Sequence, residues 1–174
     1  MFNYCPECAS KNITFSEGKV FNCPDCGFIY YHNIAAATGC LITVPEPDGE
    51  RFVFLVRGKE PAVGKLDLPG GFVDIGEGVM DGLIREMNEE IGWTPCAPLV
   101  LFASFSNVYN YKKIDYNTCD MYFSVSAPGL KPEHLRLEAA EISGVLFLKK
   151  EEIDFTRFAF PSTIKAVKTY LRIN

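Results

Sequence analysis

The stretch from residue 70 to residue 93 constrains this chain most, because its pattern predicts a helix with one apolar face and one acidic face. Apolar residues recur there at steps of three and four, which is the period of an amphipathic helix. We expect Glu77-Gly78 to begin the helix and Gly92 to end it. The expected apolar face comprises Met80, Leu83, Ile84, Met87 and Ile91, and the expected acidic face comprises Glu86, Glu89 and Glu90.

The acidic face is unusual for a helix that serves only a structural purpose. Carboxylates on adjacent turns repel each other by roughly a few tenths of a kcal/mol per exposed pair. A hard divalent cation reverses that repulsion, and Mg²⁺ in particular is commonly held by one or two carboxylates together with substrate phosphates. Gly82 lies one turn before Glu86 on the same face, so we expect it to leave room for such a substrate.

The same stretch resembles the Nudix box, the signature of hydrolases that act on a nucleoside diphosphate linked to another group X. The box sets a glycine, a glutamate, an Arg-Glu pair, a Glu-Glu pair and a final glycine at fixed spacings, so it is far more specific than a short glycine motif. Trp93 stands where the box has an aliphatic residue, and this departure keeps the apolar character. The matching positions are Gly71, Glu77, Arg85, Glu86, Met87, Glu89, Glu90 and Gly92.

The resemblance implies a fold and a metal site. The implied fold is of the α/β class, an α/β/α sandwich with a mixed sheet between helices, over about residues 34 to 172. Catalytic Mg²⁺ or Mn²⁺ would be held by Glu86, Glu89 and Glu90, with Glu86 and Glu90 as the most direct ligands. Gly71 would supply backbone freedom, and its carbonyl would join the metal ligands.

The resemblance also implies a reaction, in which a metal-activated water attacks one phosphorus of a diphosphate while a base takes its proton. Arg85 and Glu77 would pair and hold the loop and helix together. Glu89 is one candidate base. Glu141 is the second, because residues 141 to 147 resemble a segment that follows the box in many relatives and contributes a loop glutamate; Glu138 is the third.

The cysteine pattern of residues 1 to 33 predicts a separate module. Cys5-Pro6-Glu7-Cys8 and Cys23-Pro24-Asp25-Cys26 are two Cys-x-x-Cys knuckles, and a hairpin around Glu17-Gly18 is expected between them. Two knuckles on a hairpin bring four thiolates to the corners of a tetrahedron, the geometry of a structural Zn²⁺ site. Gly27 is expected to adopt the positive φ of a tight knuckle. About thirty residues bury too little surface to fold alone, so the metal would stabilise this zinc ribbon.

Residues 34 to 174 are expected to form the catalytic domain. Apolar runs predict strands at 36–44, 52–57, 99–105, 121–125 and 145–148. A final helix is expected from Phe160-Pro161, with Ile164, Val167 and Leu171 facing inward. The tyrosine-rich segment 109–116 would connect two strands, and its Tyr109, Tyr111 and Tyr116 are candidates for substrate binding by stacking on a base.

Composition and net charge restrict the kinds of partner that this chain is expected to bind. The chain of 174 residues carries a net charge of −5, which disfavours non-specific binding of nucleic acid, although a nucleotide remains acceptable when Mg²⁺ neutralises its phosphates. No apolar run approaches the roughly 20 residues that span a bilayer, and no secretory signal is visible. We therefore expect a cytoplasmic enzyme with a small nucleotide substrate and without a membrane or nucleic-acid partner, and the sequence is compatible with a homodimer.

A zinc ribbon before a Nudix domain resembles the NADH pyrophosphatase branch of the family, which makes NADH, NAD and ADP-ribose the lead substrates. Two departures weaken this assignment: the branch has a further N-terminal domain, and its Ser-Gln-Pro-Trp-Pro-Phe-Pro-type segment is replaced here by residues 104–111. Two other functions stay open. One is a catalytically silent module that senses nucleotides or binds proteins, and the other is the removal of NAD-type caps from RNA.

Overall fold

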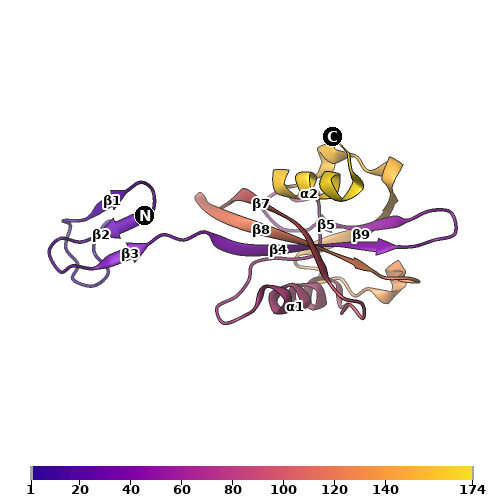
Figure 1. Ribbon diagram of the computed structural model, residues 1–174, viewed down its shortest axis with the longest axis horizontal. Helices are drawn as coiled ribbons and strands as arrows, with labels where there is room; N and C mark the ends of the chain where they lie inside the picture. Colours follow the sequence, from indigo (N-terminus) through magenta and orange to yellow (C-terminus); the bar gives the residue numbers. More distant parts are fainter. Residues whose placement is uncertain (1, 174) are drawn as a thin grey trace. The chain divides into compact units, whose positions relative to one another are not determined.

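A computed structural model describes residues 2 to 173 of the chain. The chain divides into two compact units, Met1–Ile34 and Ala35–Asn174, which are described separately below (Figure 1).

The N-terminal unit is a three-stranded antiparallel sheet with the order β1-β2-β3. Its strands are β1 (Thr14–Ser16), β2 (Val20–Asn22) and β3 (Ile29–Tyr31). The turn between β1 and β2 places Glu17 at φ 52° and Gly18 at φ 67°, which confirms the predicted hairpin. Phe21 is the large buried side chain of the unit, and it contacts the rings of Phe2 and Phe15 with centroid distances of 5.1 and 5.7 Å.

The second unit is built on a six-stranded mixed sheet. The path through the sheet is β6-β5-β4-β8-β7, and β9 pairs with β5. β4 and β8 are parallel, whereas the other pairs are antiparallel. The strands are β4 (Ala35–Val44), β5 (Arg51–Arg57), β6 (Leu66–Asp67), β7 (Val100–Tyr111), β8 (Ile114–Ser126) and β9 (Ile142–Lys149).

Two α-helices cover opposite faces of this sheet, α1 (Val79–Ile91) and α2 (Pro161–Leu171) (Figure 1). Successive strand residues point to opposite faces. In β4, Ile42 therefore packs in the core beneath α1, whereas Leu41 packs in the core beneath α2. The predicted α/β/α sandwich with a mixed sheet between helices is confirmed. Short 3-10 segments lie at Pro132–His134, Lys150–Glu152 and Phe155–Arg157.

The limits of α1 agree with the sequence pattern. Gly78 is its N-cap, and Gly92 ends it in the left-handed conformation at φ 60°, with its N–H donating to the carbonyl of Asn88. Leu83, Met87 and Ile91 are fully buried against the sheet, as predicted. The expectation for Met80 was wrong: it is 47% exposed, because Val79 supplies the apolar contact of the first turn and the next side chain is rotated by about 100°.

The tyrosine-rich segment forms no separate connection. β7 and β8 run through it and pair as far as Tyr111 and Ile114. The turn consists of Lys112 and Lys113, at φ 48° and 67°, so the hairpin has the primed geometry that matches strand twist. Sequence reasoning ended β7 too early and began β8 too late, because a Lys-Lys pair contains neither the Gly nor the Asn that is typical of such a turn.

The C-terminal helix follows the prediction. Pro161 occupies its first position, where the missing N–H leaves no hydrogen bond unmade. Val167 and Leu171 are buried and Ile164 packs beside them. Among residues 2 to 173, no helix has both the length and the apolar character that crossing a membrane requires.

Candidate active site

The glycine-rich loop before α1 runs along β4 and is hydrogen-bonded to it. The N–H groups of Cys40 and Thr38 donate to the carbonyls of Pro69 and Gly71 at 2.9 and 2.8 Å, and the N–H of Val73 donates to Ala36 at 3.0 Å. These bonds fix the loop to the centre of the sheet. Because the loop is fixed to β4, the side chains of α1 that contact the loop are held close to β4.

Gly70 and Gly71 both lie too close to neighbouring atoms for a side chain to fit, but only Gly70 has a positive φ. Gly70 has φ 143°, and a Cβ there would lie 2.2 Å from the carbonyl oxygen of Thr38. Gly71 has no positive φ, so the expectation that it supplies backbone freedom was wrong. A Cβ on Gly71 would instead lie 2.5 Å from Cδ of Glu86, so the missing side chain makes room for that carboxylate.

Gly82 also differs from expectation. It is buried, and a Cβ there would lie 2.9 Å from Oε2 of Glu77 and 3.5 Å from Cα of Val73. The loop itself therefore fills the space over Gly82, which leaves none for a substrate. The sequence places Gly82 on the acidic face correctly but does not show that the loop folds back over it.

Arg85 links this loop to the helix. Its Nε and Nη2 donate to the two oxygens of Glu77 at 2.7 and 3.1 Å, and Nη2 also donates to the carbonyl of Phe72 at 3.1 Å. Such a two-pronged bond fixes orientation as well as distance. The guanidinium of Arg85 also holds the pKa of Glu77 below its usual range. The structure thus brings together the two residues to which the Nudix resemblance assigned a supporting role.

The same guanidinium separates the three helix glutamates into different environments. Nη1 of Arg85 lies between Oε1 of Glu86 and Oε2 of Glu89, at 2.9 and 3.0 Å. Glu89 is 59% exposed at its side chain, so its bond to Arg85 is a surface ion pair. Glu86 is largely buried, and burial raises its pKa.

Glu90 faces inward at the loop. Its Oε2 accepts a hydrogen bond from the backbone N–H of Gly70 at 2.9 Å. Burial, together with the nearby carboxylates of Asp67, Glu86 and Glu141, raises its pKa to about 8. Within residues 2–173 no basic side chain forms an ion pair with Glu90. A crowded, uncompensated carboxylate of this kind fits a divalent cation, which would offset the repulsion.

A cavity of about 190 Å³ opens where the loop, β4 and β8 meet. Glu86, Glu90 and Glu141 all line it, whereas Glu89 does not. Glu141 is held there because its carbonyl accepts the N–H of Gly58 at 2.6 Å and its carboxylate pairs with Lys59. The structure therefore brings Glu141, 51 positions after Glu90 in the chain, to the same cavity.

The three tyrosines proposed for substrate binding have different positions. Tyr109 lines the cavity, whereas Tyr111 and Tyr116 are exposed and do not. Tyr109 contacts Phe72 edge-on at 5.4 Å and Phe160 at 5.6 Å between ring centroids. These three rings form the apolar wall of the cavity.

Sequence reasoning missed several residues that line the cavity. For two of them, the available signal was an acidic residue between apolar neighbours. Asp67 lies between two leucines, and Asp120 lies between Cys119 and Met121. In the structure Arg57 donates from Nη1 to Oδ2 of Asp67 at 3.1 Å, and its guanidinium lies 5.1 Å from the ring centre of Phe160. The missed residues on the cavity include Arg57, Lys59, Asp67, Phe72, Asn107, Asp120 and Phe160.

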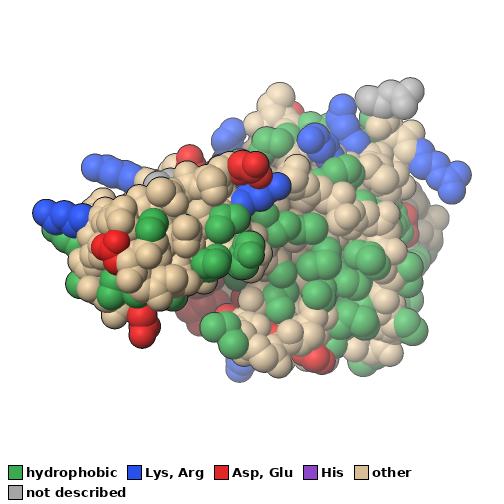
Figure 2. Space-filling model, turned by 60° about the vertical axis from the view of Figure 1, so that its left-hand side comes forward, with side chains coloured by type: hydrophobic (Ala, Val, Ile, Leu, Met, Phe, Trp, Pro, Cys, Tyr) green, Lys and Arg blue, Asp and Glu red, His purple; other side chains and the backbone are tan. Residues whose placement is uncertain are grey.

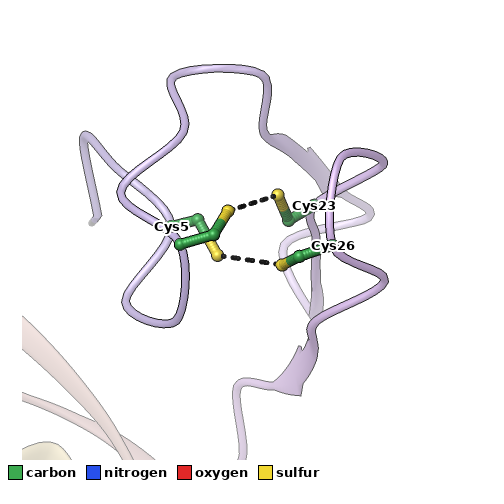
Figure 3. A group of neighbouring side chains, drawn as sticks. Cys5, Cys23 and Cys26 are labelled. Atoms are coloured by element: carbon green, nitrogen blue, oxygen red, sulfur yellow. Dashed lines mark hydrogen bonds between the residues drawn. The ribbon is translucent and has the colours of Figure 1, made fainter.

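The N-terminal unit has a cluster of its own. The sulfur atoms of Cys5, Cys8, Cys23 and Cys26 lie within 4.8 Å of one another, and this is the one such group of metal-binding side chains found among the described residues. The closest pairs, Cys5 with Cys26 and Cys8 with Cys23, are 3.6 Å apart (Figure 3).

The spacing of these sulfurs fits a metal rather than disulfides. A tetrahedron with Zn–S distances of about 2.3 Å has S···S edges of about 3.8 Å, whereas a disulfide needs about 2.05 Å. Both knuckles close in the same way, with the N–H of Ala9 donating to Cys5 and that of Gly27 donating to Cys23. Gly27 has the predicted positive φ of 78°, and Ala9 adopts φ 59° in the other knuckle. The cluster can hold a metal ion.

The fold and the site define a class of protein: an α/β/α sandwich in which a glycine-rich loop and the following helix present carboxylates to a cavity in a mixed sheet. A family model described as "NUDIX domain" matches residues 34–167. The chain belongs to this family, as the sequence resemblance indicated.

Curated relatives match part of the chain. The NAD-capped RNA hydrolase NudC of Pseudomonas aeruginosa (strain LESB58) is 28% identical over 89 residues, which are 51% of this chain and 30% of that protein. An ADP-ribose pyrophosphatase of Methanocaldococcus jannaschii is 36% identical over 67 residues, which are 38% of this chain and 37% of that protein. The matched part of the chain thus spans about a third of the length of these relatives.

Solved structures share the fold. A NUDIX hydrolase from Nitrosomonas europaea gives a TM-score of 0.65 at 23% identity, covering 98% of this chain and 91% of that one. The NUDIX domain of Shewanella oneidensis NrtR, crystallised with ADP ribose, gives 0.61 at 14% identity, covering 82% and 89%.

Proposed function

We propose that this protein hydrolyses the diphosphate linkage of nucleoside diphosphates linked to a second group, with ADP-ribose, NADH and NAD as lead substrates. One observation carries the proposal: Glu86, Glu90 and Glu141 line a single cavity that is also lined by the aromatic rings of Phe72, Tyr109 and Phe160. The carboxylates suit a cation-bound diphosphate. Aromatic rings suit the flat base or nicotinamide attached to it.

Glu86 and Glu90 would hold Mg²⁺ or Mn²⁺, with the carbonyl of Gly71 and the more exposed Glu89 as further candidate ligands. The bound ion supplies an activated water and neutralises charge on the phosphate oxygens. The carbonyl of Gly71 accepts a backbone hydrogen bond from Thr38, and the position of its missing side chain lies against the carboxylate of Glu86. Arg85 and Glu77 act as positioning residues, since their two-pronged bond keeps the loop against α1.

We assign the role of general base to Glu141 in preference to Glu89. Both carboxylates form an ion pair, but Glu141 lines the cavity and Glu89 does not. A base must come within hydrogen-bond reach of the proton that it takes, directly or through one water. Glu138, the remaining candidate, does not line the cavity, and its carboxylate accepts from the N–H of Ala140.

The lead substrates are supported by what the relatives are named for. NAD-capped RNA and ADP-ribose both contain an adenosine diphosphate joined to a second ribose. A nucleotide-sensing module without catalysis is disfavoured because Glu86, Glu90 and Glu141 are all present on the cavity.

RNA caps remain a second candidate because three relatives bear that name. The net charge of −5 disfavours a long RNA partner. In neither unit, taken by itself, does the face shown in Figure 2 carry a continuous stripe of Lys and Arg side chains. We therefore rank free dinucleotides first.

For the N-terminal unit we propose a structural zinc ribbon over about residues 1–33, held by Cys5, Cys8, Cys23 and Cys26. Four thiolates close the coordination sphere and leave no open position for catalysis. The hydrolase domain would then occupy the remaining residues, 34–174.

The test is a panel of ADP-ribose, NADH, NAD, NAD-capped RNA, a diadenosine polyphosphate and nucleoside triphosphates, with Mg²⁺ or Mn²⁺. Wild type is compared with Glu90→Gln and Glu141→Gln, and with Glu133→Gln as an exposed control in the segment Pro132–His134. We expect turnover of ADP-ribose or a dinucleotide by wild type and the control, and severe loss in both cavity variants. Absence of turnover of every compound by wild type would refute the proposal.

A further inference from the structure

Five carboxylates line the cavity, and four of them have an evident counterpart. Glu90 faces the proposed cation, and three others form ion pairs with basic side chains. The pairs are Asp67 with Arg57, Glu86 with Arg85, and Glu141 with Lys59. Asp120 is the fifth, and no basic side chain within residues 2–173 forms an ion pair with it.

Asp120 is buried, with 8% of its surface exposed, and its partners are all neutral hydroxyls. Thr118 donates to Oδ1 at 2.5 Å, while Ser162 and Tyr122 donate to Oδ2 at 2.7 and 3.4 Å. An ionised carboxylate offers about four acceptor positions. Three are used here, which leaves one acceptor position on Oδ1. Burying a carboxylate without a cation is unfavourable unless its hydrogen bonds are completed.

Asn107 lies beside this carboxylate. Phe105 is the residue opposite Asp120 in the β7–β8 register, and Asn107, two residues further along β7, stands opposite Thr118. Asn107 is therefore a diagonal neighbour of Asp120 on the same face of the sheet. Its side chain is half-buried on the cavity, and its amide has no hydrogen-bond partner among the described residues. Asp120 therefore contributes an acceptor, and Asn107 contributes both a donor and an acceptor.

The apolar wall formed by Phe72, Tyr109 and Phe160 lies close to these two polar side chains. Asp120 pairs with Ala37 of β4, which in turn forms a bridge to Phe72. Two strand spacings of about 4.8 Å therefore separate the backbones of Asp120 and Phe72. Tyr109 is two residues from Asn107 on β7 and faces the same side. A flat ring against Phe72 and Tyr109 has its edge within reach of Asp120 and Asn107.

We propose that Asp120 and Asn107 determine base specificity, by recognising a nucleobase whose edge carries an amino group beside a bare ring nitrogen. This inference rests on the proposed function. The amino N–H donates to Oδ1 of Asp120, and Nδ2 of Asn107 donates to the ring nitrogen. Adenine and cytosine have this edge. In hypoxanthine and uracil a carbonyl oxygen replaces the amino group and would face the carboxylate, so two acceptors would be opposed.

The experiment compares substrates that differ only at this group. They are NAD with its hypoxanthine analogue, and ADP-ribose with inosine diphosphate ribose. A specific pair of hydrogen bonds discriminates by roughly 10- to 100-fold, so we expect kcat/KM of wild type to favour the adenine compound by that ratio. Asp120→Asn should reduce the ratio, because its amide can donate to the carbonyl. Asp115→Asn, an exposed change on the same strand, should leave the ratio unchanged.

Asp120 also holds the start of α2 through Ser162, so its variant is paired with a second one. Asn107→Ala removes an amide without partners and is expected to fold, and it too should reduce the ratio. A purely structural role for Asp120 would lower activity on both substrates alike. An unchanged ratio in Asn107→Ala, or equal turnover of the two compounds by wild type, overturns the inference while the hydrolase proposal stands.

If wild type hydrolyses none of the substrates, the proposed function fails and the inference is tested by binding. Calorimetric titration then compares AMP with IMP, which differ at the same group. Tighter binding of AMP by about 10-fold or more that disappears in Asn107→Ala supports the inference. Equal binding overturns it.

Discussion

Glu90 accepts a hydrogen bond from the backbone N–H of Gly70 at 2.9 Å, across 20 positions of the chain. This bond joins the last turn of α1 to the loop that precedes the helix. It also places the carboxylate with the raised pKa directly beside the backbone that lies on β4. Loop, helix and sheet therefore depend on one another at the proposed metal site.

The pKa of Glu90 predicts how pH changes stability. Its folded value of about 8 lies above the usual 4.5, so the favourable contribution of the protonated form is present below about pH 4.5 and is lost as pH rises through 8. Without added Mg²⁺, the melting temperature should therefore fall between pH 6 and 8.5. Added Mg²⁺ should raise it more at pH 8.5, because cation binding requires the ionised carboxylate. Thermal unfolding at both pH values checks this. In Glu90→Gln the melting temperature should change less with pH, because the titration of Glu90 is removed. A larger Mg²⁺ effect at pH 6 would contradict it.

Substituting Gly71 should disturb Glu86. In Gly71→Ala the new methyl would lie 2.5 Å from Cδ of Glu86, so the carboxylate must move. The carboxylate is the far end of a flexible side chain, so we expect a loss in unfolding free energy of only about 1 kcal/mol, the low end for overpacking, and a much larger relative loss of activity. Gly144→Ala is the matched control, because its Cβ would make an ordinary contact of 3.6 Å with Val56. Denaturant unfolding and steady-state kinetics distinguish the two, and equal effects of both substitutions would be evidence against the assigned contact.

Replacing Arg85 by lysine should lower activity even though the charge is kept. Lysine cannot reproduce the two-pronged bond to Glu77 and the bond to the carbonyl of Phe72 at the same time. A displacement of the loop by about 1 Å is enough for roughly a 100-fold loss. The measurement is kcat/KM, with Arg51→Lys as a control on a surface ion pair. Wild-type activity in Arg85→Lys would show that the bond geometry is unimportant.

Removing the metal from the cysteine cluster should affect the N-terminal unit first. This unit has a small core, so loss of the metal should unfold it while the sheet of the second unit persists. We expect about one zinc per chain by elemental analysis, and Cys23→Ser should abolish it. Hydrogen exchange would show faster exchange in β1 to β3 alone. Full zinc occupancy in Cys23→Ser would exclude the proposed coordination.

Much of the local architecture was predictable from the sequence. The period of Leu83, Met87 and Ile91 and the caps at Gly78 and Gly92 determine α1, because helix contacts join residues three and four apart. The knuckles around Cys5 and Cys23 were predictable for the same reason, since each closes within a few residues. The burial of Met80, the end of β7 and the start of β8 were mispredicted, because neighbours distant in sequence decide them.

The sequence alone therefore determined α1, through its short-range periodicity, and the cysteine cluster, through the spacing within its two Cys-x-x-Cys knuckles. Tertiary structure decided which polar residues share the cavity. Register between β4 and β8 brought Asp120 to the site, and the bond from Gly58 to the backbone of Glu141 brought that carboxylate to it. The tertiary structure also places Tyr109 on the cavity, whereas Tyr111 and Tyr116 do not line it. Such choices depend on strand pairing across many tens of residues, which no local pattern encodes.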